Sequence, residues 1–238
     1  MFPYDNALLE AVQGVPQSVS DVLNTMKTID ATCIDGDGLK WFNWLYSQVT
    51  QAVEDRVSGG GFNDPAWLSH LDVRFAALYF DALRASLAGA SLPGCWSAMF
   101  SVRDQTRIAR IQFALAGVNA HINHDLPLAI IATCQDTGKV PQHGTPEYSD
   151  YTSLNGNLDG LIETAKHTLN VRLLGDELPG ASHLEDTIAA WNLSAARENA
   201  WNTAQGLWQQ SSALIELHLD VIDGLTTVIS KSLLVPVP

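Results

Sequence analysis

The residues best suited to chemistry lie in one short segment near the middle of the chain. His121, His124 and Asp125 follow one another in the sequence NAHINHDLP. Residues three or four positions apart share one face of a helix, so the three side chains are expected to converge. An imidazole titrates near neutral pH and can move protons, and a neighbouring carboxylate can orient it. Asn119 and Asn123 flank the histidines, and we assign them to substrate binding.

Three roles are open for this segment. In the first, His121 is a catalytic acid or base, and Asp125 or Asp72 orients it. In the second, His121 and His124 begin a metal site, which needs further ligands from another helix because zinc is usually four-coordinate. In the third, Asp125 only caps the next helix, and the neighbouring polar side chains bond loose backbone groups.

A second group of polar side chains lies in the segment 64–87. Asp72 and Tyr79 lie beside its apolar stripe, so both are expected to be partly buried. A buried carboxyl group needs a partner, and a buried tyrosine hydroxyl usually finds one. We therefore name Asp72 as a catalytic candidate and Tyr79 as a pocket wall, with a purely structural role as the alternative.

A third group combines an arginine with tryptophan. Arg197 and Trp201 are four residues apart and share a helix face. Arg197 could bind a carboxylate or carbonyl of a substrate, or it could form a buried bridge to Asp72 or Asp125. Trp201 is either a core residue or a wall of an apolar pocket.

The elements that must position these residues are all predicted to be helices. Apolar residues recur with helical spacing, and no alternating run of β-branched residues is bounded by hairpin turns. The expected helices cover about 17–31, 37–57, 64–87, 96–102, 103–123, 125–133, 150–174, 183–210 and 212–233. Residues 134–150 are expected to form the one long non-helical connection. The prediction is one all-α domain, residues 1–238, built as a bundle of about seven to nine helices.

Composition excludes several classes of protein. Thirteen Lys and Arg against 26 Asp and Glu give a net charge of −13, which is the opposite of a nucleic-acid-binding footprint. Apolar stretches are too short to span a bilayer, and the N-terminus lacks the pattern of a secretory signal, so we expect a cytoplasmic protein without membrane contact. The three cysteines, Cys33, Cys95 and Cys134, form no CxxC pair and are expected to be buried free thiols. Nucleotide and phosphate-binding motifs are missing, so we expect no cofactor.

The segment Gly117–Pro127 resembles the GxNAHINxDLP core of a family of all-helical bacterial and fungal proteins of unknown function. Three further pieces resemble the same family and extend the likeness over residues 65–210, whereas residues 1–60 match no pattern. They are FAALYFDAL (75–83), the pair Asp150 and Asn155, and the late helix from Trp191 to Leu207 with Arg197, Ala200 and Trp201. The family pattern fixes His121, Asn123 and Asp125 but not His124. The resemblance therefore implies a His–Asp–Arg hydrogen-bonded centre rather than a metal site, and Asn155 joins the substrate-binding candidates.

These expectations combine into one main functional hypothesis and two alternatives. The main one is a cofactor-independent enzyme of secondary metabolism that acts on a hydrophobic small molecule as a cyclase, lyase or isomerase, including a pericyclic (Diels–Alder-type) reaction. His121 would be the acid or base, and a shaped apolar pocket would hold the reactive conformer. The alternatives are a metal-dependent hydrolase or lyase and a non-enzymatic helical binding protein.

Overall fold

Several helices begin where the sequence offers a side chain that caps the first turn. Asp64 accepts a hydrogen bond from the backbone of Trp67, and Pro65 occupies the first helical position. Ser18 and Asp37 cap the two preceding helices in the same way. These local signals set the start of each of the three long helices that build one side of the molecule.

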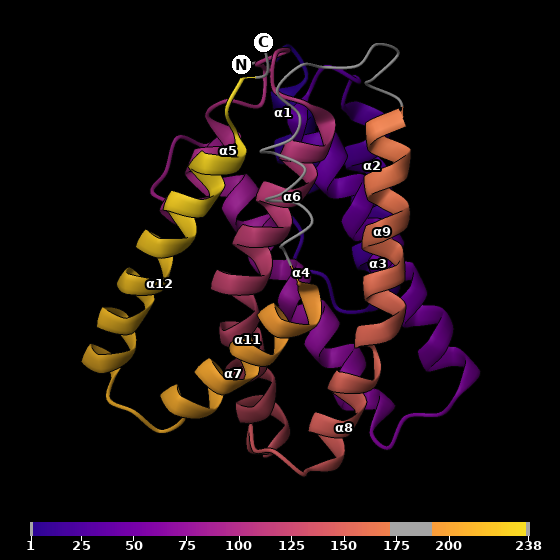
Figure 1. Cartoon of the computed structure of the whole chain (residues 1–238), viewed down its shortest axis with the longest axis vertical. Coiled ribbons are helices and arrows are strands. Elements are labelled where there is room, and N and C mark those ends of the chain that lie inside the picture. The colour runs from indigo at the N-terminus through magenta and orange to yellow at the C-terminus, as the bar shows by residue number, and fades with distance from the viewer. Residues whose placement is uncertain (1, 172–191, 237–238) are drawn as a thin grey trace.

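Figure 1 shows a computed structural model of the chain, in which residues 2–171 and 192–236 are described. These residues form helices and no strands, so the predicted all-α, single-domain fold is confirmed. The α-helices are α1 (Asp5–Ala11), α2 (Val19–Thr32), α3 (Gly38–Gly59), α4 (Pro65–Leu87), α5 (Gly94–Phe100), α6 (Arg110–Ala120), α7 (Leu126–Thr137), α8 (Pro146–Ser153), α9 (Asn155–Val171), α11 (Leu193–Leu207) and α12 (Ser212–Leu233); a π-helical turn, η1 (His121–Asp125), joins α6 to α7.

Some boundaries differ from the predicted ones. Residues 103–109 are turns rather than the first part of a helix, and α6 begins only at Arg110. The predicted connection 134–150 is shorter, because α7 continues to Thr137 and ends at the left-handed Gly138. The short α1 was not predicted, and of its seven residues only Leu8 is buried. Of the predicted helix 183–210, residues 183–191, which include Trp191, lie outside the described part.

The rod formed by α6, η1 and α7 runs through the bundle, with α3 and α4 on one side and α11 and α12 on the other. Helices α3 and α6 approach closely at Gly117, where a Cβ atom would overlap the ring of Phe42. Glycine in the GxNAHIN segment is therefore explained by packing. The hydrophobic core is continuous around this rod, and all three cysteines are buried free thiols, as predicted.

Within the described ranges, none of the helices is both long and apolar enough to cross a membrane.

Candidate functional site

The candidate site is built on the π-helical turn η1. Here the backbone N–H of Leu126 donates to the carbonyl of His121, five residues earlier. Pro127 follows, and a proline has no N–H with which to continue a regular α-helical ladder. The chain adjusts with one wider turn and continues as α7. Single π-turns inside α-helices are frequent at functional sites.

Because the helix continues, Asp125 has no free helix end to cap. Its backbone is helical, and its side chain makes no capping hydrogen bond. The prediction that Asp125 caps the next helix is therefore wrong.

The Asp125 carboxylate instead accepts three hydrogen bonds from buried donors. His121 Nδ1 and Trp96 Nε1 bond Oδ2 at 2.9 and 3.0 Å, and His124 Nδ1 bonds Oδ1 at 2.7 Å. Burial alone would raise the pKa of Asp125, but the hydrogen bonds from the two histidines outweigh it and lower that pKa below its ordinary value. Asp125 is thus an ionised carboxylate inside the core. The expected convergence of His121, His124 and Asp125 is what the structure contains.

This carboxylate fixes the protonation of His121. A carboxylate only accepts hydrogen bonds, so Nδ1 of His121 carries the proton and Nε2 presents a lone pair. Burial lowers the pKa of His121, against the opposing effect of Asp125, so the ring is neutral at pH 7. Nε2 is buried and has no hydrogen-bond partner among the residues that the structure describes.

Two aromatic rings hold the imidazole of His121 in place. Phe75 stacks on it with ring centroids 3.5 Å apart and planes 6° apart, and Tyr46 meets it edge-on at 4.5 Å. Phe75, Tyr46 and Trp96 are not among the site residues predicted from the sequence, although Phe75 begins the segment 75–83 that resembles the family. As aromatic residues in apolar stretches, they have no signal that separates them from other core residues.

His124 differs from His121 in the direction in which its pKa is shifted. Burial lowers the pKa of His124, but the hydrogen bond and charge of Asp125, with a contribution from Asp223, outweigh burial and raise it. The Nδ1 atoms of both histidines bond the same carboxylate, which leaves only their Nε2 atoms as possible metal ligands. The described residues also contain no group of three or more histidine, cysteine or acidic side chains arranged to hold one.

Two small cavities adjoin this centre. His121 and Arg197 line the first, whose volume is about 40 Å³ and whose other walls are apolar. Asp72 and Arg197 line the second, also about 40 Å³, and Phe75 and Tyr46 border both. One water needs roughly 10–15 Å³ of such volume, so each cavity has room for a small chemical group rather than a fused ring system.

Arg197 is buried with no carboxylate partner among the described residues. Its Nε donates to Asn155 Oδ1 at 2.8 Å, and one terminal nitrogen donates to the carbonyl of Tyr151 at 2.9 Å. The guanidinium also lies over the Tyr151 ring, 4.0 Å from its centroid. The bridge to Asp72 or Asp125 that the sequence left open is absent. A buried guanidinium without a counter-ion is suited to bind an anionic or carbonyl oxygen.

Asp72 is buried, as predicted, but its expected partner is missing. The side chain is 8% exposed, and Oδ2 is buried without a hydrogen bond. Burial, with a smaller contribution from the charge of Glu54, raises the pKa of Asp72 to about 7. Asp72 does not contact His121 as an orienting group, and Asp125 does so alone.

The remaining candidates hold helices together. Asn119 donates from Nδ2 to the carbonyl of Thr226 and to Ser230 Oγ of α12, both at 3.0 Å, and Asn123 donates to Asn119. Tyr79 and Trp201 are fully buried, and neither lines the two cavities. Asn155 touches the site only through Arg197. These five residues support the centre rather than face its cavities.

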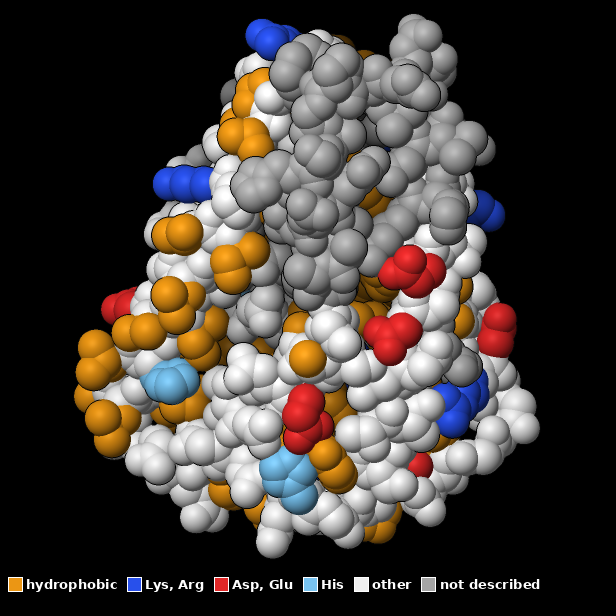
Figure 2. All heavy atoms as spheres, viewed as in Figure 1, with side chains coloured by type: hydrophobic (Ala, Val, Ile, Leu, Met, Phe, Trp, Pro, Cys, Tyr) orange, Lys and Arg blue, Asp and Glu red, His pale blue; other side chains and the backbone are white. Residues whose placement is uncertain are grey.

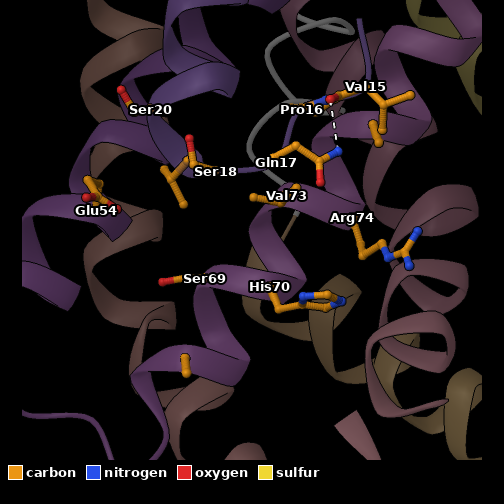
Figure 3. Close-up of a pocket in the computed structure, with 13 residues that line it drawn as sticks. Val15, Pro16, Gln17, Ser18, Ser20, Glu54, Ser69, His70, Val73 and Arg74 are labelled. Carbon is orange, nitrogen blue, oxygen red and sulfur yellow. Dashed lines mark hydrogen bonds between the residues drawn. The ribbon is translucent and has the colours of Figure 1, made fainter. Parts of the chain in front are cut away.

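A larger hollow lies elsewhere, outside α4. This groove of about 540 Å³ lies between the residues before α2 and the outer side of α4 (Figure 3). Its ionisable groups include His70 and Arg74, and both already bond the exposed Asp136. Size alone would favour this groove for a ligand, but none of its described acid–base groups is buried like those behind α4.

A family model matches residues 19–236 and describes a family of unknown function, DUF5995. The chain belongs to this family. The match begins well before the residues whose motifs resemble a family, so α2 and α3 also belong to the shared fold. No curated protein and no solved structure matches the chain.

Proposed function

We propose that this DUF5995 protein is a cofactor-independent enzyme that performs acid–base chemistry on a small hydrophobic molecule. The observation that carries the proposal is the state of His121. Its Nδ1 is held by an ionised carboxylate, its ring is neutral, and its Nε2 is buried without a partner beside an apolar cavity. An unmade hydrogen bond at a buried acceptor costs about 1–3 kcal/mol. At His121 this acceptor belongs to a cavity-lining residue, so a substrate could supply the missing donor.

In this mechanism His121 is the general base. Nε2 takes a proton from the substrate, and the imidazolium that forms is stabilised by Asp125, with His124 and Trp96 holding that carboxylate. The same Nε2 then returns the proton at another substrate atom. Proton removal at one position and return at another is the chemistry of an isomerase, a lyase or a cyclase.

Arg197 is the electrostatic partner of this base. It lines the same cavity as His121 and forms no ion pair with a carboxylate among the described residues, so it would bind a carboxylate or a carbonyl oxygen that gains charge during proton removal. Asn155 and Tyr151 are positioning residues that fix the guanidinium. The substrate would thus combine an apolar body with one anionic or carbonyl group.

Access to the site would depend on Phe75. This ring is only partly buried, stacks on His121 and borders both cavities. A rotation of Phe75 would join the two cavities and expose one face of the imidazole. Asp72 would then face the same space as a carboxyl group that titrates near neutral pH.

Substrate depletion in a small-molecule extract tests the proposal. Small-molecule extracts of cells that produce the protein are incubated separately with purified wild type, with His121→Gln and with the control His218→Gln. The compounds in the three samples are then compared by untargeted mass spectrometry. His218 is an exposed histidine of α12 away from the site. We expect at least one compound to be converted by wild type and by the control, and to be converted about 100-fold or more slowly by His121→Gln.

The readout also separates enzyme from binding protein. Arg197→Lys should lower kcat/KM for the same compound, because lysine keeps the charge and loses the planar fork. If no compound changes, or if folded His121→Gln converts the same compounds as wild type, the enzyme proposal fails. The helical binding protein then replaces it.

A further inference from the structure

Helix α12 has an inner face that is firmly attached to the bundle. Asp223 accepts hydrogen bonds from the backbone N–H groups of Gly94 and Cys95 at 2.7 and 2.9 Å, at the start of α5. Asn119 bonds the helix at Thr226 and Ser230, which are both buried. These contacts fix the rotation of α12, and therefore also fix which side chains face outward.

The outward side of α12 is apolar along most of its length. We define the outer stripe as five residues that are 52–67% exposed: Leu214, Leu217, Val221, Leu225 and Val228. Ile229, at 43%, borders it. Figure 2 shows hydrophobic side chains gathered at the left of the molecule, where Figure 1 places α12 at the edge of the bundle. The exposed apolar area is on the order of 600 Å², at the upper limit of what monomeric proteins show.

The spacing of the outer stripe is symmetric about its centre. Leu217 and Leu225 lie four residues on either side of Val221, and Leu214 and Val228 lie seven residues on either side. The successive steps are three, four, four and three residues, and such steps keep the side chains on one face of a helix. In two antiparallel copies related by a two-fold axis through Val221, each residue of one stripe faces the residue that lies equally far on the other side of Val221 in the other stripe.

We propose that two copies of this chain associate through α12, antiparallel, with the two-fold axis at Val221. Leu214 of each copy then packs against Val228 of the other, and Leu217 against Leu225. Together the two outer stripes would bury on the order of 1,200 Å², the lower bound for a specific protein–protein interface. Antiparallel packing also places opposite ends of the two helix dipoles together.

Charge favours a second copy over a membrane as the occupant. The outer stripe contains no ionisable residue. Helices that lie on membranes carry many lysines and arginines on their polar face. The only lysine or arginine of α12 is Lys231, and the helix also contains the acidic residues Glu216 and Asp220. The net charge of −13 makes two copies repel each other at long range. The association should therefore strengthen as salt is added, which a complex with a basic partner would not do.

Sedimentation velocity over a range of protein concentrations tests the association. Wild type should show a concentration-dependent dimer that is more populated at 0.5 M than at 0.05 M NaCl. Val221→Asp should raise the dimer Kd at least tenfold, because it buries two facing carboxylates on the axis. The matched control is Val15→Asp, a valine that is 65% exposed and lies outside α12, which should leave Kd unchanged. A wild type that is monomeric at every concentration overturns the proposal.

Cysteine cross-linking tests the register. In Val221→Cys the two new thiols meet at the axis, so mild oxidation should give a covalent dimer. In Leu214→Cys the two thiols lie about 21 Å apart along the helices, since fourteen residues separate their levels. That variant should cross-link only when mixed with Val228→Cys. The native cysteines are buried and do not compete. Equal cross-linking of the Val221→Cys and Leu214→Cys variants, or none in either, would refute the antiparallel arrangement.

Discussion

Asp125 and Asp72 are both buried carboxyl groups beside the two small cavities, but their surroundings give them opposite properties. Asp125 accepts hydrogen bonds from His121, His124 and Trp96, whereas Asp72 has a buried oxygen with no donor. The pKa of Asp125 lies below its ordinary value, and burial raises that of Asp72 to about 7. Burial acts in the same direction on both groups, so the number of donors decides whether the group is charged.

The difference separates two uses of a buried acid. Asp125 is a fixed negative charge that orients a base and stabilises its protonated form. Asp72 stays neutral in mildly acidic solution and acquires its charge only near neutral pH. The native structure therefore depends on the first charge and is opposed by the second, and each of the following changes tests one side of this contrast.

Removal of Asp125 should have the largest effect. Asp125→Ala leaves three buried N–H groups without their acceptor and removes the negative charge that raises the pKa of His124. We expect a loss of about 3–5 kcal/mol in the free energy of unfolding, the usual result of breaking a buried charged network. Urea denaturation followed by tryptophan fluorescence measures it.

The control for this change is Asp136→Ala. Asp136 also has two basic partners, His70 and Arg74, but all three side chains are at least one-third exposed. Exposed ion pairs contribute little, so this variant should lose far less stability. Similar losses at the two positions would show that the Asp125 network does not differ energetically from a surface ion pair.

Replacement of Asp72 should have the opposite sign. A carboxyl group whose pKa is raised on folding binds its proton more tightly in the native state, so stability falls as pH rises from the unfolded value near 4 through about 7. Asp72→Asn removes the ionisation. We expect the variant to resemble wild type at pH 5 and to be more stable by a few kcal/mol at pH 9, since each unit of pKa corresponds to about 1.4 kcal/mol.

Chemical denaturation at pH 5, 7 and 9 measures this gain. Glu54→Gln is a useful companion, because the charge of Glu54 contributes to the raised pKa of Asp72. In the Glu54→Gln variant the free energy of unfolding should depend on pH slightly less than it does in wild type. An Asp72→Asn variant that is less stable than wild type at pH 9 would mean that Asp72 has a partner when ionised, and the contrast with Asp125 would disappear.

The sequence predicts those parts of the molecule that depend on local order. Helical periodicity and the Asp64–Pro65 start predict α4, and the one-turn spacing of His121 and Asp125 predicts that they meet. The π-turn is not predictable from periodicity, since it changes the hydrogen-bond pattern over only five residues. Its trace in the sequence is Pro127, which reads equally well as the first residue of a new helix.

Contacts between distant segments are the part that the sequence does not supply. Trp96 and Asp125 are 29 residues apart in the sequence. Only the folded structure shows that the indole N–H donates the third hydrogen bond to this carboxylate. Arg197 is predicted to be a site residue, with an aspartate as a possible partner, but the structure gives it an amide and a backbone carbonyl instead. Residue types predict that a buried charge needs compensation, but they do not predict which group provides it.

The two histidines give the smallest and most specific test. For His124 the pKa is raised on folding, so its stabilising contribution is complete below the unfolded value near 6.5 and is lost as pH rises through the folded value. For His121 the pKa is lowered, so stability is lost as pH falls from about 6.5 towards its folded value. In wild type the two opposite trends partly cancel in a plot of stability against pH.

Long-range ¹H–¹⁵N spectra of the imidazole rings separate them. At pH 6.5 we expect His121 as a neutral ring with the proton on Nδ1, and His124 mostly as the doubly protonated cation. Asp125→Asn removes the charge that raises the His124 pKa, so in that variant His124 should lose its proton at lower pH. If both rings of wild type titrate together near 6.5, Asp125 is not the ionised acceptor described here. His121 then lacks the fixed lone pair on Nε2 that a general base requires.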